Sequence, residues 1–167
     1  GGYSDSILGR LPARAVKTLS GKATKASIAI GASRDGLRSV SNRVSAEDLV
    51  SLQAEVVVDP KHVSIQGSVH VLLALEGSSD IYQLSSQGRI HLWDGSIAGL
   101  EAFGGSAPLN AIEQLTIMNR LRLGNAFAGE RLAVFVAYQV TNIDAESGDS
   151  EIEIVYPEAP YWLSIEP

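Results

Sequence analysis

The stretch Leu52-Gln-Ala-Glu-Val-Val-Val-Asp-Pro60 decides the fold class, because apolar and polar side chains alternate in it until a proline ends the pattern. A period of two puts alternate side chains on one face of a β-strand. Asp59-Pro60 ends this strand, since proline cannot donate to a central ladder. The apolar face is expected to hold Leu52, Ala54, Val56 and Val58.

Similar segments recur along the chain on both sides of this strand, with Gly, Pro, Asp and Ser turns between them. No helical pattern is long enough for parallel crossovers, although 112–121 has some helical character and Ser45-Ala-Glu-Asp48 predicts at most one helical turn. The pattern predicts an all-β, antiparallel, immunoglobulin-like β-sandwich, with a closed barrel as the alternative. Strands are expected at 23–32, 52–58, 68–75, 81–84, 89–93, 112–121, 131–140, 151–156 and 161–165.

Composition limits the classes of function. A chain of 167 residues with 45% hydrophobic residues fits one domain. The net charge of −6 excludes a fold-wide basic surface for nucleic acid and a polybasic membrane patch. No apolar run approaches a membrane span, so membrane insertion is not expected. The chain has no cysteine, which excludes disulfides, thiolate zinc sites and a catalytic thiol.

Residues 1–22 differ from the rest and are interpreted as an N-terminal arm on a β-sandwich domain of residues 23–167. Gly9 and Pro12 oppose a stable helix there. Apolar side chains left in water lose burial worth roughly 1.5–3 kcal/mol each, so the arm should dock. We expect it to add a strand to a neighbouring copy; the alternative is an arm folded back on its own sheet or left disordered. The self-assembly residues are Ile7, Leu8, Leu11, Val16 and Leu19.

Four short motifs stand between Ile28 and Ile154: Ser45-Ala-Glu-Asp, Val56-Val-Val-Asp-Pro-Lys-His-Val63, Trp93-Asp-Gly-Ser-Ile-Ala98 with Phe103, and Phe135-Val-Ala-Tyr138. In this order they resemble an uncharacterised, immunoglobulin-like β-sandwich domain of exported bacterial cell-surface proteins. The resemblance covers about three-quarters of the chain and has no assigned chemistry. It implies a secreted or cell-surface location; an N-terminal Gly-Gly-Tyr fits either signal-peptide cleavage or a trimmed chain.

Two sets of side chains are candidates for metal binding. Four carboxylates around Gly148 form a weak calcium candidate whose spacing departs from calcium-loop patterns, so a solvated hairpin tip is the preferred interpretation. His62, His70 and His91 lack the convergent ligands of a zinc site, and His62 is expected to close the Asp59-Pro60 turn. No cofactor is expected. The calcium candidates are Asp144, Glu146, Asp149 and Glu151.

Catalytic patterns are lacking, since no Gly-x-Ser-x-Gly elbow and no Gly-rich phosphate loop occurs. Trp93 is interpreted as a core or sheet-edge aromatic, and Tyr161 and Trp162 are candidates for a contact between subunits. The sequence therefore predicts a non-catalytic extracellular structural subunit whose partners are copies of itself, assembling as a pilus-like filament through the arm. The alternative is a cell-surface binding module for glycan or protein.

Overall fold

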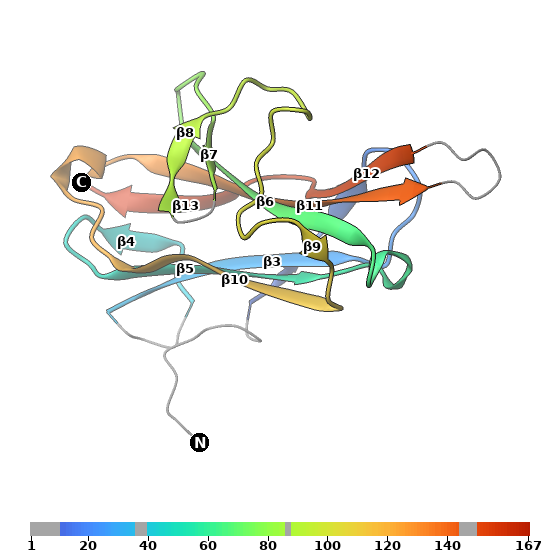
Figure 1. The fold of residues 1–167 in the computed structure, drawn as a ribbon. Coiled ribbons are helices and arrows are strands. Elements are labelled where there is room, and N and C mark those ends of the chain that lie inside the picture. Colours follow the sequence, from blue (N-terminus) through green and yellow to red (C-terminus); the bar gives the residue numbers. More distant parts are fainter. Residues whose placement is uncertain (1–10, 36–39, 86–87, 144–149) are drawn as a thin grey trace.

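A computed structural model describes residues 11–35, 40–85, 88–143 and 150–167. These residues form an all-β structure in which two sheets pack face to face (Figure 1). The strands are β1 (Ala13–Arg14), β2 (Val16–Thr18), β3 (Ser27–Arg34), β4 (Arg43–Ser45), β5 (Val50–Val57), β6 (Gln66–Leu75), β7 (Tyr82–Leu84), β8 (Ile90–Leu92), β9 (Ala107–Pro108), β10 (Ile112–Leu121), β11 (Arg131–Ile143), β12 (Ser150–Pro157) and β13 (Tyr161–Glu166). Short 3-10 helices are η1 (Pro60–His62) and η3 (Asn125–Phe127).

The two sheets differ in width. The narrow sheet has four antiparallel strands in the order β1-β3-β5-β10. The wide sheet has nine strands and follows the order β2-β12-β11-β6-β7-β8, with β13 between β11 and β4 and with β9 on β6. β11 lies at its centre, pairing with β6 along one side and with β13 and then β12 along the other. β13 and β4 pair in parallel.

The hydrophobic core lies between the two sheets. Leu52, Ala54 and Val56 are fully buried, and Val58 nearly so, which confirms the apolar face predicted for that strand. Facing them are alternate residues of β11, among them Val136 and Tyr138, which belong to the same core cluster. Alternating side chains of both sheets thus fill one layer, as a sandwich requires, so the barrel alternative is not the fold.

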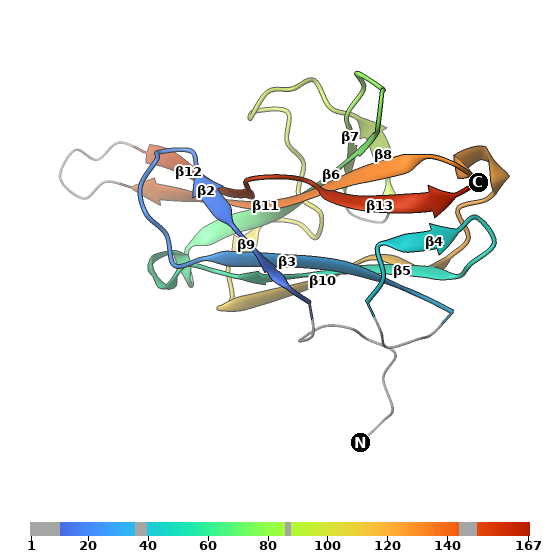
Figure 2. The ribbon, with the colours of Figure 1, turned by 180° about the vertical axis from the view of Figure 1, so that it is seen from behind.

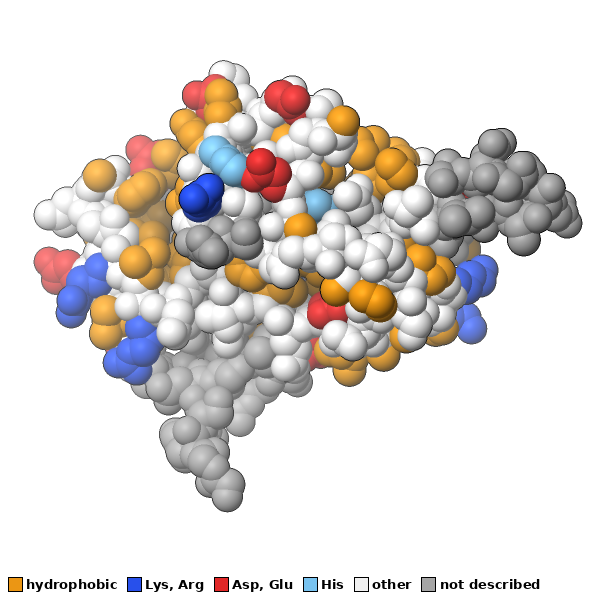
Figure 3. Space-filling model, viewed as in Figure 1, with side chains coloured by type: hydrophobic (Ala, Val, Ile, Leu, Met, Phe, Trp, Pro, Cys, Tyr) orange, Lys and Arg blue, Asp and Glu red, His pale blue; other side chains and the backbone are white. Residues whose placement is uncertain are grey.

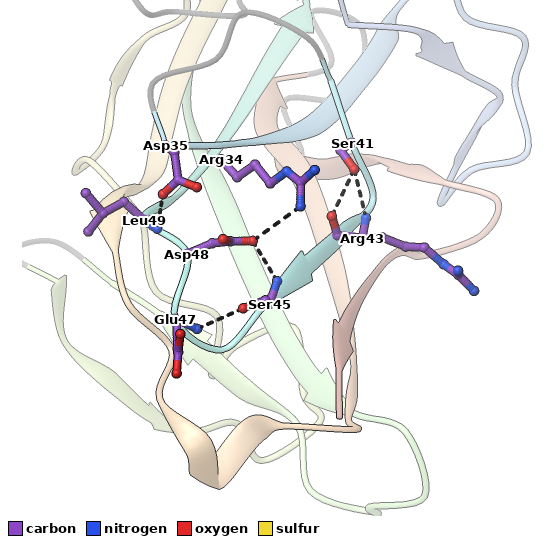
Figure 4. Close-up of polar contacts among 8 residues, drawn as sticks. All are labelled: Arg34, Asp35, Ser41, Arg43, Ser45, Glu47, Asp48 and Leu49. Carbon is purple, nitrogen blue, oxygen red and sulfur yellow. Dashed lines mark hydrogen bonds and ion pairs between the residues drawn. The ribbon is translucent and has the colours of Figure 1, made fainter.

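The segment Ser45–Asp48 is a turn and not the helical turn that its sequence predicts (Figure 4). The Ser45 hydroxyl accepts the Glu47 N–H at 3.2 Å, and the Asp48 carboxylate accepts the Ser45 N–H at 2.7 Å. Helix N-caps use similar contacts, in which the cap hydroxyl accepts an N–H two or three residues on and a side chain three residues on accepts the N–H of the cap residue. Here the chain turns from β4 toward β5 at once, so the contacts close a tight turn. Arg34 adds an ion pair to Asp48 at 3.7 Å.

The described part of the N-terminal segment runs along both sheets at one side of the sandwich (Figure 2). Ala13 and Arg14 pair with Ile28 and Ala29 of β3 in the narrow sheet. β2 pairs with β12 in the wide sheet, with Lys17 opposite Tyr156. One short segment therefore forms an edge strand of each sheet in turn.

Candidate functional site

The connection between β2 and β3 is held by a buried carboxylate, that of Asp59. It accepts the Thr24 hydroxyl at 2.7 Å, the Lys25 N–H at 3.2 Å and the Lys61 N–H at 3.0 Å. Burial acts to raise the pKa of Asp59, but the hydrogen bonds from Lys61, Thr24 and Lys25 outweigh it and hold the pKa below its ordinary value. Asp59 is therefore a charged acceptor that ties residues 24–25 to the end of β5.

A buried tyrosine and histidine lie directly behind Asp59. The Tyr138 hydroxyl accepts the Asp59 N–H at 3.1 Å and lies 2.8 Å from His62 Nδ1. A hydroxyl that accepts from Asp59 still has its own proton to donate, and His62 Nδ1 lies within reach of it. Burial is the main cause that raises the pKa of Tyr138 to about 12. The phenol therefore stays neutral and satisfies two buried groups from the centre of β11.

A second carboxylate, that of Glu153 on β12, holds the start of the same connection. It accepts the Ser20 N–H at 3.1 Å, and its other oxygen is hydrogen-bonded to the Ser20 hydroxyl. Burial acts to raise the pKa of Glu153, but the bonds from Ser20 and from the Ile154 N–H leave it lowered. A polar cavity of about 180 Å³ lies among these groups, lined also by Thr18, Lys22, Lys61 and His62.

Arg14 fixes the other end of the N-terminal segment. Its guanidinium donates to the Pro160 carbonyl oxygen at 2.7 Å and lies 5.9 Å from the centre of the Tyr161 ring. Val16 packs against the hydrophobic core. Arg14, Glu153 and Asp59 together make a clamp that holds residues 14–25 across the open side of the sandwich. We call these three residues and the Tyr138–His62 pair the arm anchor.

The residues proposed for self-assembly have different environments. Val16 is half-buried on the core, Leu11 is half-buried, and Leu19 is 50% exposed. Ile7 and Leu8 lie outside the described residues. In the single chain, residues 13–18 pair with their own sheets, which is the fold-back arrangement for this part of the arm.

The calcium candidates fall mostly outside the described residues. Three of them lie outside the described residues: Asp144, Glu146 and Asp149. Glu151 lies exposed on β12, where it lines the polar cavity. Within residues 11–35, 40–85, 88–143 and 150–167, no group of three or more His, Asp or Glu side chains is placed to hold a metal ion.

The three histidines are spread over separate environments. His62 closes its turn as expected, because its backbone N–H donates to the Asp59 carbonyl oxygen at 2.8 Å. His70 is buried, with Nδ1 donating to the Glu101 carbonyl at 2.7 Å and Nε2 2.9 Å from the Ser68 hydroxyl. Burial lowers the pKa of His70, although its bond to Glu101 opposes the shift. His91 contacts the Glu101 carboxylate through Nε2. Glu101 thus connects His70 and His91.

The aromatic candidates also differ from one another. Trp93 is half-buried directly after the edge strand β8 and donates to the Ser96 carbonyl oxygen at 2.9 Å. Tyr161 is buried under Arg14, and Trp162 lies 4.4 Å from the Arg131 guanidinium. These two C-terminal aromatics are therefore engaged within the chain.

Sequence reasoning missed Tyr138 and Glu153 as parts of the arm anchor. The sequence indicates that Tyr138 is buried, because Tyr138 alternates with aliphatic residues on the inward face of its strand. A buried phenol needs a hydrogen-bond partner, but nothing in the sequence identifies Asp59, 79 positions away, as that partner. Glu153 gave no such signal, since alternating charge is ordinary on an exposed strand.

Among the described residues, no helix has the length and apolar character needed to cross a bilayer. Comparison of the chain with family models, with curated proteins and with solved structures gives no match.

Proposed function

We propose that this chain is a non-catalytic structural subunit, exported to a bacterial cell surface, that assembles with copies of itself by exchanging residues 11–19. The observation that carries the proposal is the pairing of β1 with β3 and of β2 with β12, each at the edge of a sheet. The same segment of another copy can make the same contacts, because an edge strand adds through backbone hydrogen bonds. The cell-surface resemblance of the motifs supports the location.

The hinge for such an exchange is the turn at Gly21. Thr18 closes this turn twice, since its carbonyl oxygen accepts the Gly21 N–H at 3.2 Å and its hydroxyl donates to the Lys22 carbonyl oxygen at 2.7 Å. On opening, residues 11–19 leave while Asp59 retains Thr24. Reciprocal exchange between two copies closes as a dimer, whereas exchange in one direction propagates as a filament.

Cross-linking of Lys17 to Tyr156 tests the exchange. The two exposed residues face each other in a hydrogen-bonded pair of the β2–β12 ladder, where Cα atoms lie about 5.5 Å apart. That spacing suits a disulfide, and the chain has no other cysteine. We expect Lys17→Cys protein mixed with Tyr156→Cys protein, then oxidised, to yield covalent heterodimers on a non-reducing gel.

The double variant Lys17→Cys/Tyr156→Cys controls for the geometry and should close within one chain when diluted. As a matched pair that does not face each other, Lys17→Cys mixed with Ile152→Cys should give only background. If the mixed single variants also give only background at high concentration while the double variant closes, residues 11–19 do not exchange and the proposal fails.

Gly21→Ala is expected to shift the population toward the exchanged form by roughly tenfold. Gly21 has φ +79°, and an added Cβ meets no atom within 4 Å, so the cost comes from the backbone alone. A left-handed conformation costs an L-residue roughly 1–2 kcal/mol, and only the closed turn requires it. Gly77, with φ +86° and the same free space, is the matched control. Size-exclusion chromatography after refolding should show more dimer for Gly21→Ala and not for Gly77→Ala.

A binding module for glycan or protein is the second candidate. A cavity of about 290 Å³ lies beside β6 and β10, with Phe103, Gln114 and Thr116 among its lining residues. Its volume is at the lower end of the range for ligand pockets. Binding of a soluble glycan, followed by chemical-shift changes at Gln114 and Thr116 in the monomer, would favour this function over assembly.

A further inference from the structure

The strand β8 is the last strand of the wide sheet and lies in the part of it that extends beyond the narrow sheet (Figure 1). Exposure increases outward along two rows of side chains on the inner face of this sheet. The rows end at Ile90 and Leu92. These side chains are 61% and 60% exposed, although they project from the same face of the sheet as the core residues of β6. The first row is Val71, Leu84 and Ile90; the second is Leu73, Tyr82 and Leu92.

The hydrogen-bonding pattern between β7 and β8 determines which backbone N–H and C=O groups of β8 point away from β7. The Trp93 N–H donates to the Ile81 carbonyl oxygen, and the Ser85 N–H donates to the Arg89 carbonyl oxygen, both at 2.8 Å. Odd-numbered residues of β8 therefore bond to β7. In an antiparallel ladder the intervening residues point their backbone groups the other way. The N–H and C=O groups of Ile90 and Leu92 thus face outward, where no strand of the described chain lies.

The other sheet edges carry features that hinder pairing with a second molecule. Natural edges are protected by charged side chains, proline, bulges or short length. β8 is short, but its residues 90–92 include no lysine, arginine or proline and no register shift. The protecting features elsewhere are Arg14 on β1, Lys17 on β2, Arg43 on β4, Pro108 on β9 and two register shifts in β10.

We propose that β8 pairs antiparallel with β8 of a second copy around a two-fold axis. The pairing must set outward-facing residues opposite each other, and Ile90 opposite Leu92 of the second copy uses the free groups of both residues. His91 then faces His91 of the second copy on the axis. On the inner face the two apolar rows continue across the junction, so side chains exposed in one copy are covered by those of the other.

Charges on the opposite face of β8 fit the same register. Arg89 lies diagonally across from His91 of the second copy, which contacts the Glu101 carboxylate. Diagonal neighbours are about 7–8 Å apart, within reach of long side chains. Each arginine therefore meets the partner carboxylate, and the contact repeats across the axis. Figure 3 shows basic, acidic and histidine side chains close together beside exposed hydrophobic ones, over this hairpin and the segment that follows it. Positive and negative side chains are thus both present at this edge, although the chain has a net charge of −6.

His91→Cys tests this register directly. Residue 91 would occupy a non-hydrogen-bonded pair on the axis, with Cα atoms about 4.5 Å apart, which is within disulfide range. Under mild oxidation we expect a covalent homodimer. Arg89→Cys is the matched control, because residues 89 of the two copies would lie four positions apart and stay unlinked. Cross-linking of Arg89→Cys at the same rate as His91→Cys would overturn the proposal.

The unmodified chain provides the second test. Sedimentation velocity up to about 1 mM protein should show reversible dimers, and Leu92→Lys should weaken dimerisation at least tenfold. Ile112→Lys, at a side chain 51% exposed on β10, should leave it unchanged. Cross-linking between Lys17→Cys and Tyr156→Cys reports arm exchange separately and should not respond to Leu92→Lys. A chain that remains monomeric at 1 mM, or equal effects of Leu92→Lys and Ile112→Lys, would exclude the β8 pairing.

Discussion

Replacing Tyr138 by phenylalanine is expected to lower the free energy of unfolding by about 2–4 kcal/mol. The ring still fills its place in the core, so the loss comes from the hydroxyl alone. Without it, the buried Asp59 N–H and His62 Nδ1 both lose their hydrogen-bond partner. Each unsatisfied buried group costs roughly 1–3 kcal/mol. Urea denaturation followed by circular dichroism measures the change.

Tyr156→Phe is the matched control, since Tyr156 also lies on a strand but is exposed. Its loss should stay within about 0.5 kcal/mol. Equal losses for the two variants would mean that the Tyr138 hydroxyl has no special structural role.

The same substitution should also affect the arm anchor. The Tyr138 hydroxyl holds the backbone N–H of Asp59, and the carboxylate of Asp59 accepts hydrogen bonds from Thr24 and Lys25. Tyr138→Phe should therefore also speed hydrogen exchange at the Lys25 amide.

Acidification is expected to destabilise the chain through Asp59 and Glu153. Both carboxyls have pKa values below their ordinary values of 3.8 and 4.5 when folded. A lowered folded pKa gives stability that is fully present above the unfolded value and is lost as the pH falls through the folded one. Stability should therefore fall as the pH drops below about 4.5. Thermal unfolding between pH 7 and pH 2 measures the profile.

Asp59→Asn isolates the contribution of one carboxylate. The amide keeps an acceptor oxygen but loses the charge that strengthens three hydrogen bonds, so we expect a loss of about 1.5–3 kcal/mol at pH 7. Because part of the pH dependence is removed, the acid limb of the profile should also become shallower. Asp80→Asn, at an exposed residue between β6 and β7, should change neither quantity. An Asp59→Asn profile parallel to that of the unaltered chain would contradict the assignment.

The alternating patterns predicted the sheets well, because burial on one face leaves a local record in the sequence. The fully buried face of β5 is an example, as is the end of that strand before Pro60. The Ser45–Asp48 segment shows the limit: its capping residues are those of a helix start, yet tertiary pairing of β4 with β13 commits the chain to a turn.

The arm anchor was mostly beyond sequence reasoning, because its members meet only through the fold. His62 and Tyr138 are 76 positions apart, and Ser20 and Glu153 are 133 apart. No spacing rule joins residues at such distances. What the sequence did supply was the Asp59-Pro60 turn and the presence of apolar residues among the first 22 positions, without the partners of either.

The pairing of Thr18 with Val155 also fixes an order of events during synthesis. The ribosome makes the first residue of this pair long before the second, and at rates of 5–20 residues per second the delay is on the order of ten seconds. During that interval β2 has no partner strand in its own chain. On a polysome, a neighbouring nascent or finished copy can offer that strand first. Slowing translation between Thr18 and Val155 should therefore alter the ratio of monomer to exchanged form, a ratio that refolding of complete chains would not reproduce.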